Sequence, residues 1–400
     1  MTIALQTRPL QPWQVITGGV CALVLTLGLG RFAYTPLLPL MQQQAGLSDT
    51  AGGWMAAVNY AGYMSGALLA AWLDGPALRH RLYGIGIWLS LLVTMLMGMG
   101  IWPAAWALSR YLGGLCGAAG MLLGSGLVLN WLMRHGRPPE LGKYFSGIGL
   151  GIVVSALGAM GMTRLGLDWA QQWQGFAFLG LLLFLAPAWA WRPPIPSASP
   201  AISPSAEPGA PAPEAAAPSR RWMALMLFAY FCAGWGFVIN GTFIAAIVER
   251  QPLLAGQGPL TWLLVGLAAT PAVFLWDGVA RRLGGLPTLL LAFGLQTAGV
   301  LLQVLSGGLA AALGEALIYG ATSIGIVSLT LALVGRRSPA NPGKAMARLT
   351  LGYGLAQISA PALAGYMVHA SGSYQATLWL TALALVAGMA ALLVLWRAGE

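Results

Sequence analysis

Trp13 to Met41 has the sequence WQVITGGVCALVLTLGLGRFAYTPLLPLM, an apolar run with a single charged side chain, Arg31. Because about 20 consecutive apolar residues suffice to cross a bilayer as a helix, this stretch predicts a membrane span. A charge in hydrocarbon costs at least about 2.5–3.5 kcal/mol by insertion scales. We therefore expect Arg31 to face a polar partner, a water-filled cavity or a substrate.

The composition of the whole chain agrees with this prediction. Its 400 residues are 58% hydrophobic and 8% charged, whereas soluble domains carry roughly 25% charged residues. So little charge cannot cover a water-exposed surface, and long apolar runs without alternation favour helices over a closed barrel. The first run is too long for a signal-peptide core, so it is expected to remain as a helix. The composition predicts an all-α polytopic membrane protein.

Twelve apolar runs are long enough to span the membrane, six on either side of a Pro/Ala/Ser-rich stretch. Since that stretch has almost nothing to bury, we predict a flexible cytoplasmic linker over 192–221, an N-terminal six-helix bundle over 1–191 and a C-terminal one over 222–400. Weak sequence similarities between corresponding helices of the two halves favour two pseudo-symmetric bundles with a site near their interface. The predicted spans are approximately 13–41, 51–73, 82–102, 104–132, 144–164, 173–191, 222–248, 260–276, 286–305, 309–334, 349–369 and 374–396.

The basic residues test this topology. With the N-terminus inside, sixteen Lys and Arg residues fall in inside segments, and only Arg164 and Arg250 fall in outside segments. This asymmetry follows the positive-inside rule and predicts that both termini are cytoplasmic.

The sequence argues against several other classes of protein. The net charge of +10 lies in loops and forms no aromatic-interleaved patch, so we expect no nucleic-acid partner. Cys21, Cys116 and Cys232 have no paired spacing and are interpreted as buried thiols without a metal. No phosphate loop, HExxH, Ser/His/Asp set or paired Cys/His ligands are present, so we predict neither an enzyme nor a cofactor.

Three charged residues lie well inside predicted spans: Arg31, Arg110 and Glu315. By helical rise all three fall in the outer half of the membrane, and Arg110 and Glu315 occupy equivalent positions in the fourth and tenth spans. We hypothesise that Glu315 pairs with Arg110 or Arg31 in an outward-closed state. Since no His lies near a span midpoint, Glu315 is also the best proton-coupling residue. The alternative is that each charge makes a fixed packing contact or snorkels to the interface.

Polar residues inside the spans are candidates for a substrate-binding or gating surface. Tyr34 and Thr35 share a helix face with Arg31. For any one tyrosine, an anchoring role at the membrane interface is the alternative. With Arg31 and Arg110, the candidate set is Tyr34, Thr35, Asn59, Tyr63, Tyr230, Asn240, Thr242, Tyr319 and Gln357.

At this point the chain resembles a known group. Twelve spans split six and six, with Arg110-Tyr-Leu-Gly-Gly-Leu-Cys-Gly117 in the fourth, look like the major facilitator superfamily. Gly28 to Met41, Gly53 to Tyr63, Tyr230 to Phe237 and Gly354 to Pro361 resemble the YbfB/YjiJ branch more specifically. The resemblance implies a secondary transporter of the bacterial inner membrane, but it implies no particular substrate.

We therefore expect a secondary active transporter that moves a small organic anion or metabolite by alternating access, with proton coupling as a further hypothesis. Its expected partners are a small-molecule substrate and membrane lipid, and it is expected to be a monomer. One alternative is an exporter of hydrophobic compounds or lipids. The other is a non-transporting membrane receptor or scaffold, although the large soluble domain typical of that class is missing.

Overall fold

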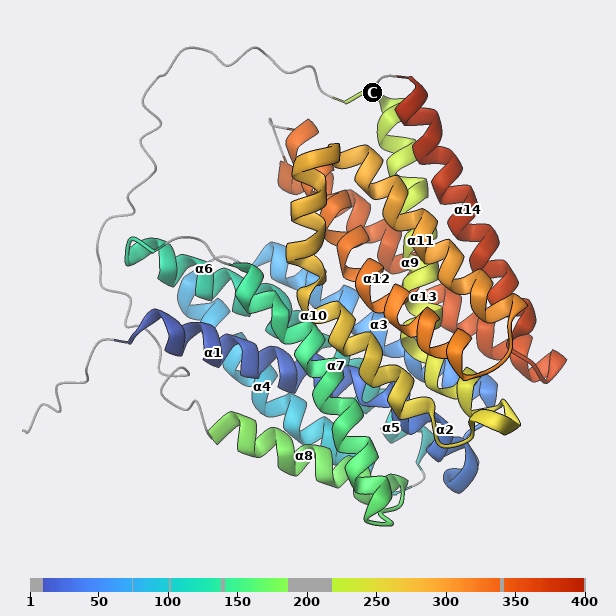
Figure 1. Cartoon of the computed structure of the whole chain (residues 1–400). Coiled ribbons are helices and arrows are strands. Elements are labelled where there is room, and N and C mark those ends of the chain that lie inside the picture. The colour runs from blue at the N-terminus through green and yellow to red at the C-terminus, as the bar shows by residue number, and fades with distance from the viewer. Residues whose placement is uncertain are drawn as a thin grey trace, which may run out of the picture.

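The computed structural model describes residues 10–73, 75–100, 102–137, 141–185, 218–338 and 342–398, and within these ranges every regular element is helical (Figure 1). The elements are α1 (Pro12–Leu23), η1 (Val24–Phe32), α2 (Tyr34–Ala45), α3 (Asp49–Trp72), α4 (Pro76–Met97), α5 (Pro103–Ala118), η2 (Ala119–Gly124), α6 (Ser125–Arg134), α7 (Leu141–Arg164), α8 (Trp169–Leu185), α9 (Arg220–Glu249), η4 (Pro252–Leu254), α10 (Gly258–Leu283), α11 (Gly285–Leu305), α12 (Leu309–Arg337), α13 (Pro342–Ser371) and α14 (Gln375–Arg397).

These elements form twelve rods, because α1–η1–α2 and α5–η2–α6 are each continuous. In the part of the chain that the structure describes, nine rods are long and apolar enough to cross a membrane by length and composition. The remaining three are α3, α8 and α13. The predicted all-α architecture is confirmed, with twelve helical rods in the described ranges.

The ends of the rods differ from the predicted spans by several residues. α4 begins at Pro76 instead of residue 82, since proline suits the first turn of a helix, where its missing N–H is not needed. α9 begins at Arg220, inside the predicted linker, because the Ser219 hydroxyl accepts the Trp222 N–H at 3.0 Å and caps the helix. Residues 192–217 of that linker lie outside the described ranges.

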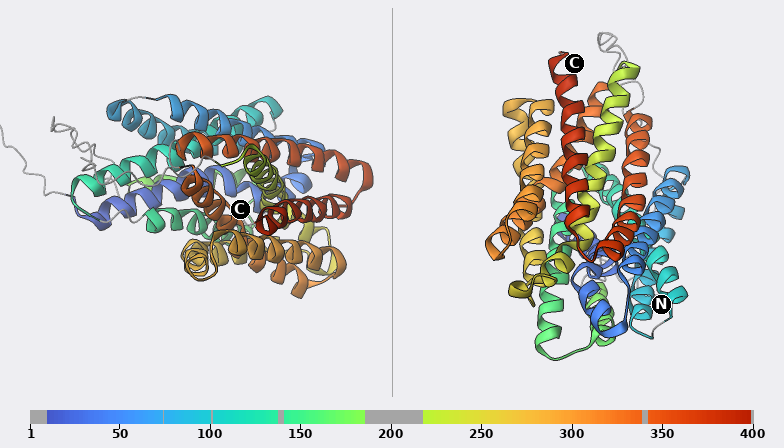
Figure 2. Two further views of the ribbon diagram at one scale, coloured as in Figure 1. Left: turned by 90° about the horizontal axis from the view of Figure 1, so that it is seen from above. Right: turned by 90° about the vertical axis from the view of Figure 1, so that its right-hand side faces the viewer.

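The two halves repeat the same packing scheme. In the first half α3 packs on α5, α7 on η1, and α4 on α8; in the second half α10 packs on α12, α13 on α9, and α11 on α14. Each contact in one half has its counterpart six rods later. The repetition gives the two pseudo-symmetric bundles of the predicted fold, and Figure 2 shows them side by side.

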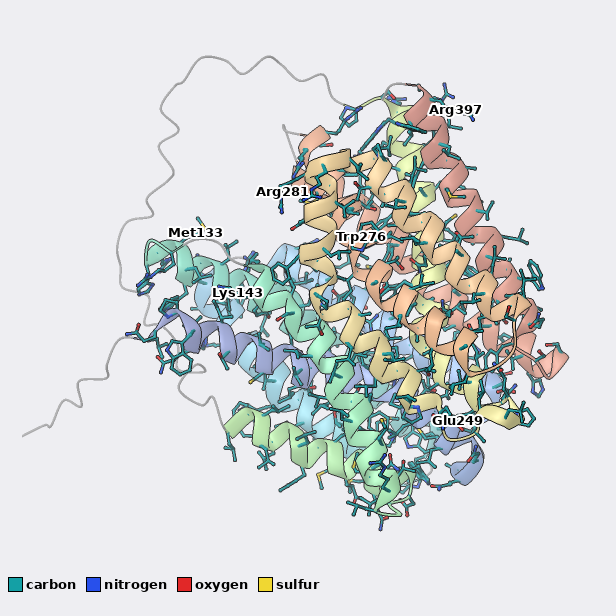
Figure 3. All side chains as sticks on the ribbon, viewed as in Figure 1. Met133, Lys143, Glu249, Trp276, Arg281 and Arg397 are labelled. Carbon is teal, nitrogen blue, oxygen red and sulfur yellow. The ribbon has the colours of Figure 1, made fainter. Side chains whose placement is uncertain are left out.

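The bundles meet along α3 with α13, α7 with α10, and α2 with α9. Glycines allow the approach of α3 and α13: a Cβ at Gly53 would lie 3.1 Å from the Cα of Gly365. In Figure 1 the rods come together where α2 and α9 end and diverge toward the start of α1 and the end of α14. We name these the closed end and the terminal end. Figure 3 shows Lys143, Arg281 and Arg397 toward the terminal end and Glu249 at the closed end.

Candidate functional site

Arg31 lies in a π-helical segment. η1 joins α1 to α2, and the Ala33 N–H donates to the Gly28 carbonyl, five residues back, at 2.9 Å. Gly28 allows a close helix contact, because a Cβ there would lie 2.6 Å from the Cα of Gly151 in α7. A π turn inserts an extra residue into a helix and is frequent at functional sites. The segment is buried throughout, and the Arg31 side chain points into the protein.

Aromatic rings surround the guanidinium of Arg31. Its Cζ lies 4.1 Å from the ring centroid of Tyr60, 5.2 Å from that of Tyr63 and 5.5 Å from that of Phe32. Its Nε is buried without a hydrogen-bond partner, and within the described ranges no acidic side chain pairs with it. Ring contacts attract the cation but leave its N–H groups unsatisfied. Arg31 therefore has donors left for an anionic ligand.

Arg110 in α5 has a different environment. Its Nε donates to the Met55 carbonyl at 3.4 Å, its Nη1 donates to the Gly30 carbonyl at 3.3 Å, and its Cζ lies 4.4 Å from the Tyr34 ring centroid. The carbonyl of Arg110 itself accepts the Asn59 amide at 2.7 Å. These contacts join α3, α5 and the first rod, and they supply the partners that a buried guanidinium needs.

Glu315 in α12 does not meet either arginine. Both of its carboxylate oxygens are buried without a hydrogen-bond partner, and a Cβ at Gly299 of α11 would lie 3.8 Å from the Glu315 Cγ. The hypothesised pair with Arg110 or Arg31 is therefore absent from this arrangement, although the bundles do meet at the closed end. The physical reason is the rotation of α12 about its axis, which turns Glu315 toward α11 inside the second bundle.

Tyrosines of the second bundle form a group of their own around Phe237. The rings of Tyr230 and Tyr353 stack with centroids 4.4 Å apart, and the Tyr319 hydroxyl donates to the Phe237 carbonyl at 2.7 Å. The Phe237 ring lies between them, with its centroid 6.3 Å from that of Tyr319 and 6.0 Å from that of Tyr353. These tyrosines are buried inside the protein and do not anchor it at a lipid interface.

The other candidate residues lie near this region or between the bundles. The Thr35 hydroxyl donates to the Gly241 carbonyl at 2.6 Å and so links α2 to α9. Next to that carbonyl, both amide atoms of Asn240 are buried without a partner. Thr242 and Gln357 are buried as well, and the Tyr34 hydroxyl donates to the Gly52 carbonyl at 2.9 Å. Their roles in binding or gating stay predictions.

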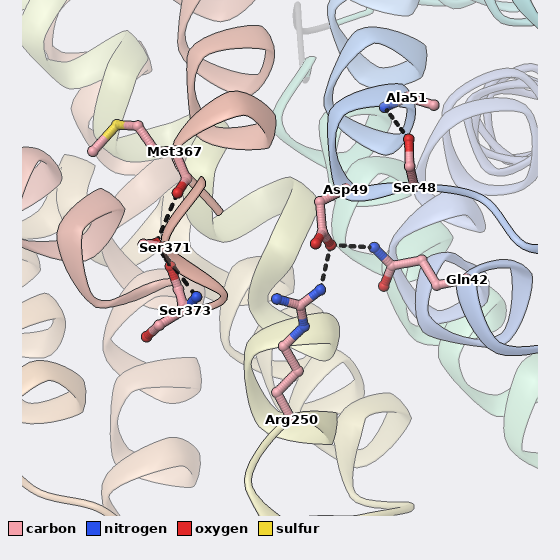
Figure 4. A network of polar contacts seen from close by, with 8 residues as sticks. All are labelled: Gln42, Ser48, Asp49, Ala51, Arg250, Met367, Ser371 and Ser373. Atoms are coloured by element: carbon pink, nitrogen blue, oxygen red, sulfur yellow. Dashed lines mark hydrogen bonds and ion pairs between the residues drawn. The ribbon is translucent and has the colours of Figure 1, made fainter. Parts of the chain in front are cut away.

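A polar network holds the bundles together at the closed end (Figure 4). Asp49 at the start of α3 forms an ion pair with Arg250, which follows α9, and also accepts the Gln42 amide at 2.8 Å. Nearby, the indole N–H of Trp54 donates to the Tyr366 hydroxyl at 3.3 Å. Contacts that cross between bundles at one end are the type that alternating access would make and break.

Sequence reasoning missed several of these residues. It treats Arg250 as a loop charge and does not single out Asp49, although two opposite charges at the ends of predicted spans are a signal for a pair. It also overlooks Gln296 and Gln303 in α11; both are buried, and all their amide atoms lack partners. Two glutamines seven residues apart in a span without charges are a usable signal, because they share a helix face.

Comparisons with known proteins agree with this architecture. A family model described as an uncharacterised MFS-type transporter, YbfB, matches residues 23–395. No curated protein matches the chain. Among solved structures, the nucleoside transporter NupG has a TM-score of 0.74 at 13% identity, with 96% of this chain and 99% of that chain covered.

A second solved structure is similar over nearly the same length. It is a bacterial homologue of the human lysosomal transporter Spinster, captured inward-facing and occupied. Its TM-score is 0.66 at 15% identity, with 97% of this chain and 98% of that chain covered. At these identities the two structures are similar to this chain in fold alone.

Proposed function

The chain belongs to the family of MFS-type transporters described by the YbfB model, and from this premise we propose that it is a secondary transporter of a small organic anion. Membership makes it a multi-pass membrane protein with a small-molecule substrate. The nature of that substrate and the residues that bind it are the proposed part.

The observation that carries the proposal is the environment of Arg31. Its guanidinium is held by the rings of Tyr60 and Tyr63 and lacks an acidic partner in the part of the chain that the structure describes. A buried cation without a counter-charge is costly, and a carboxylate or phosphate group would offset that cost with charge-assisted hydrogen bonds. Carboxylates and phosphates are therefore the proposed ligand groups.

Alternating access would proceed between the two bundles. The Asp49–Arg250 pair and the Thr35–Gly241 hydrogen bond lie on this interface, so opening the closed end requires that the ion pair break. We place the terminal end in the cytoplasm of a bacterium, with both chain termini inside, because the sixteen-to-two charge asymmetry follows the positive-inside rule. We also retain the division into bundles over 1–191 and 222–400 with a linker over 192–221.

A binding screen tests the anion site. Purified protein is screened by thermal shift against metabolite carboxylates and phosphates, and each stabilising compound is then tested on Arg31→Ala. Since hydrogen bonds to charged groups contribute about 1.5–3 kcal/mol, the variant should bind about 10- to 100-fold more weakly. Arg164→Ala, which removes an exposed arginine at the end of α7, is the matched control.

Three results would contradict the proposal. Equal binding of every hit by the wild type and Arg31→Ala would remove Arg31 from the site. Stabilisation only by uncharged hydrophobic compounds, together with drug sensitivity of a deletion strain, would favour export of hydrophobic compounds. Binding without flux in proteoliposomes would favour a receptor. Proton coupling through Glu315 is tested separately, by whether flux responds to a pH gradient.

A further inference from the structure

Four helix ends of the second bundle surround a cavity at the terminal end of the molecule. Its volume is about 390 Å³, and it is lined by the start of α9, the start of α11, the end of α12 and the end of α14. The charged side chain in its lining is that of Arg337, the last residue of α12. Figure 3 shows Arg397, the neighbour of the lining residue Trp396, at this end. The cavity therefore presents a cation at the level where the helices end.

Arg337 has donors available for a ligand. Its Cζ lies 5.5 Å from the ring centroid of Trp222, which is within the range of a cation–π contact. In the part of the chain that the structure describes, no acidic side chain forms an ion pair with Arg337. A ring attracts the guanidinium but accepts none of its N–H groups in the plane of the fork, and a phosphate group accepts such a fork through two oxygens. The side chain is therefore suited to an anionic group.

An apolar groove continues from this cavity between α11 and α14. Pro287 and Trp396 line both the cavity and the groove, so the two adjoin. The groove has a volume of about 410 Å³ and runs about 12 Å along the axis of α11, which approaches the hydrocarbon depth of one leaflet, roughly half of 30 Å. Its lining residues on α11 have the spacing of one helix face, and they are Pro287, Leu290, Leu291, Gly294 and Leu295.

The groove opens to lipid. α11 and α14 are both long and apolar enough to cross a membrane, and Leu291 and Leu295 expose 43% and 42% of their surfaces. Gly294 keeps the groove open, because a Cβ there would meet nothing closer than the Met389 Sδ at 3.9 Å. Trp396 is 54% exposed at the boundary with the cavity, and tryptophan is enriched at the level of lipid head groups. The order of arginine, tryptophan and leucines matches the order of phosphate, interface and acyl chain in a phospholipid.

We propose that the cavity and the groove bind one anionic phospholipid, with its phosphate against Arg337 and one acyl chain in the groove. Basic pockets between spanning helices bind lipid head groups in this way. A second copy of this chain could cover an apolar groove, but an apolar helix would not supply the anionic group that suits Arg337. The lipid is a bound component of the leaflet at the terminal end and is not the transported substrate. The proposal rests on the membrane-spanning fold and is independent of the Arg31 site.

Native mass spectrometry of the delipidated full-length protein tests the site. The probes are phosphatidylglycerol, which is anionic, and phosphatidylcholine with the same acyl chains, which has no net charge. We expect one phosphatidylglycerol to bind about fivefold more tightly than phosphatidylcholine. Arg337→Gln should remove that preference, since a basic residue near the membrane surface contributes roughly this factor. Gly294→Leu fills the groove and should weaken the binding of both lipids about tenfold, the effect of displacing about two CH₂ groups.

Matched controls separate the site from general effects. Arg281→Gln removes an exposed arginine at the same end of the molecule (Figure 3) that does not line the cavity. Gly84→Leu adds a leucine to α4, the rod equivalent to α11, where a Cβ would meet nothing within 4 Å. Both variants should bind the two lipids as the wild type does. Arg31→Ala should do so as well, so the lipid measurement and the anion screen succeed or fail separately.

Several outcomes would overturn the proposal. Equal binding of the two lipids by the wild type, or an equal loss of preference in Arg337→Gln and Arg281→Gln, would remove the phosphate from Arg337. Unchanged lipid binding in Gly294→Leu would remove the acyl chain from the groove. Displacement of phosphatidylglycerol by an equimolar amount of glycerol 3-phosphate, which has no acyl chain, would make this a site for free phosphate. A lipid-free dimer that Gly294→Leu dissociates would assign the groove to a second copy of the chain.

Discussion

Arg110 in the first bundle and Glu315 in the second occupy equivalent rods, yet their charges are accommodated in opposite ways. Arg110 donates to two carbonyls on two other helices and lies against a tyrosine ring. Glu315 has neither a donor nor a cation beside its oxygens in the described ranges. The first arrangement is complete within the protein, whereas the second leaves both carboxylate oxygens without a partner in the described ranges. The difference indicates that, of these two charged side chains, only that of Arg110 holds neighbouring helices together.

The largest expected effect is that of removing Arg110. Arg110→Ala leaves a cavity between α3, α5 and η1, and we expect the free energy of unfolding to fall by about 3 kcal/mol. Arg110→Lys keeps the charge but loses the planar fork that reaches two carbonyls, so it should lose about half as much. Thermal unfolding in detergent measures both. If Arg110→Ala were as stable as the wild type, the structural role of Arg110 would be rejected.

Next in size is the effect of Tyr60. Its ring is the one nearest to the Arg31 guanidinium, and a desolvated cation–π contact contributes about 2 kcal/mol. Tyr60→Leu should lower the free energy of unfolding by about 1–2 kcal/mol and weaken anion binding, because Arg31 loses its orientation. A double-mutant cycle with Arg31→Met checks the coupling. Additive effects of the two changes would mean that the ring does not hold Arg31.

Glu315→Gln should have a smaller effect of opposite sign. The variant keeps the shape of the side chain and cannot ionise, so its stability should exceed that of the wild type by up to about 1 kcal/mol at alkaline pH, where Glu315 would carry a charge without a partner. The free energy of unfolding of Glu315→Gln is measured alongside that of Arg110→Lys, because both substitutions keep a polar side chain at the position. A loss of several kcal/mol in Glu315→Gln would show that the carboxylate has a stabilising partner.

The smallest effect on stability is expected at the Asp49–Arg250 pair, which is partly exposed, with 35% of the Arg250 side chain accessible. Such pairs contribute about 0.2–1 kcal/mol, so Asp49→Asn should change the unfolding midpoint little. It should nevertheless increase the population that is open at the closed end. Spin labels on the ends of α2 and α9 report this as a longer distance. An unchanged distance distribution would show that the pair is no gate.

The comparison of Arg110 with Glu315 also shows where prediction from sequence fails. Their places within the spans follow from the apolar runs on either side, and those runs are local. The partners of each side chain depend on how the helix is rotated about its axis and on which helix lies beside it. Hence the sequence places Glu315 inside its span but assigns it the wrong neighbour, because α11 faces it instead of the first bundle.

The closed end offers a second example. Arg250 and Asp49 are 201 residues apart, and nothing local in either segment requires that they meet. Their contact follows from the packing of α3 on α13 and of α2 on α9, which small residues such as Gly53 and Gly365 permit. Glycine spacing indicates close packing in general but does not identify the partner helix.

The sequence by itself determined that lipid surrounds most of this protein, and it determined the number of rods and their division into two halves. These conclusions follow from the length of the apolar runs, the placement of the charges and the composition of the linker, which are all local properties of the chain. The sequence also placed Arg31, Arg110 and Glu315 inside predicted spans. Only the tertiary structure decided that Arg31 lies in a π-helical segment among tyrosines, that Arg110 is satisfied by carbonyls and that Glu315 is not. The reason is that hydrogen bonds and ring contacts require groups from different helices within a few ångströms, and only packing sets those distances.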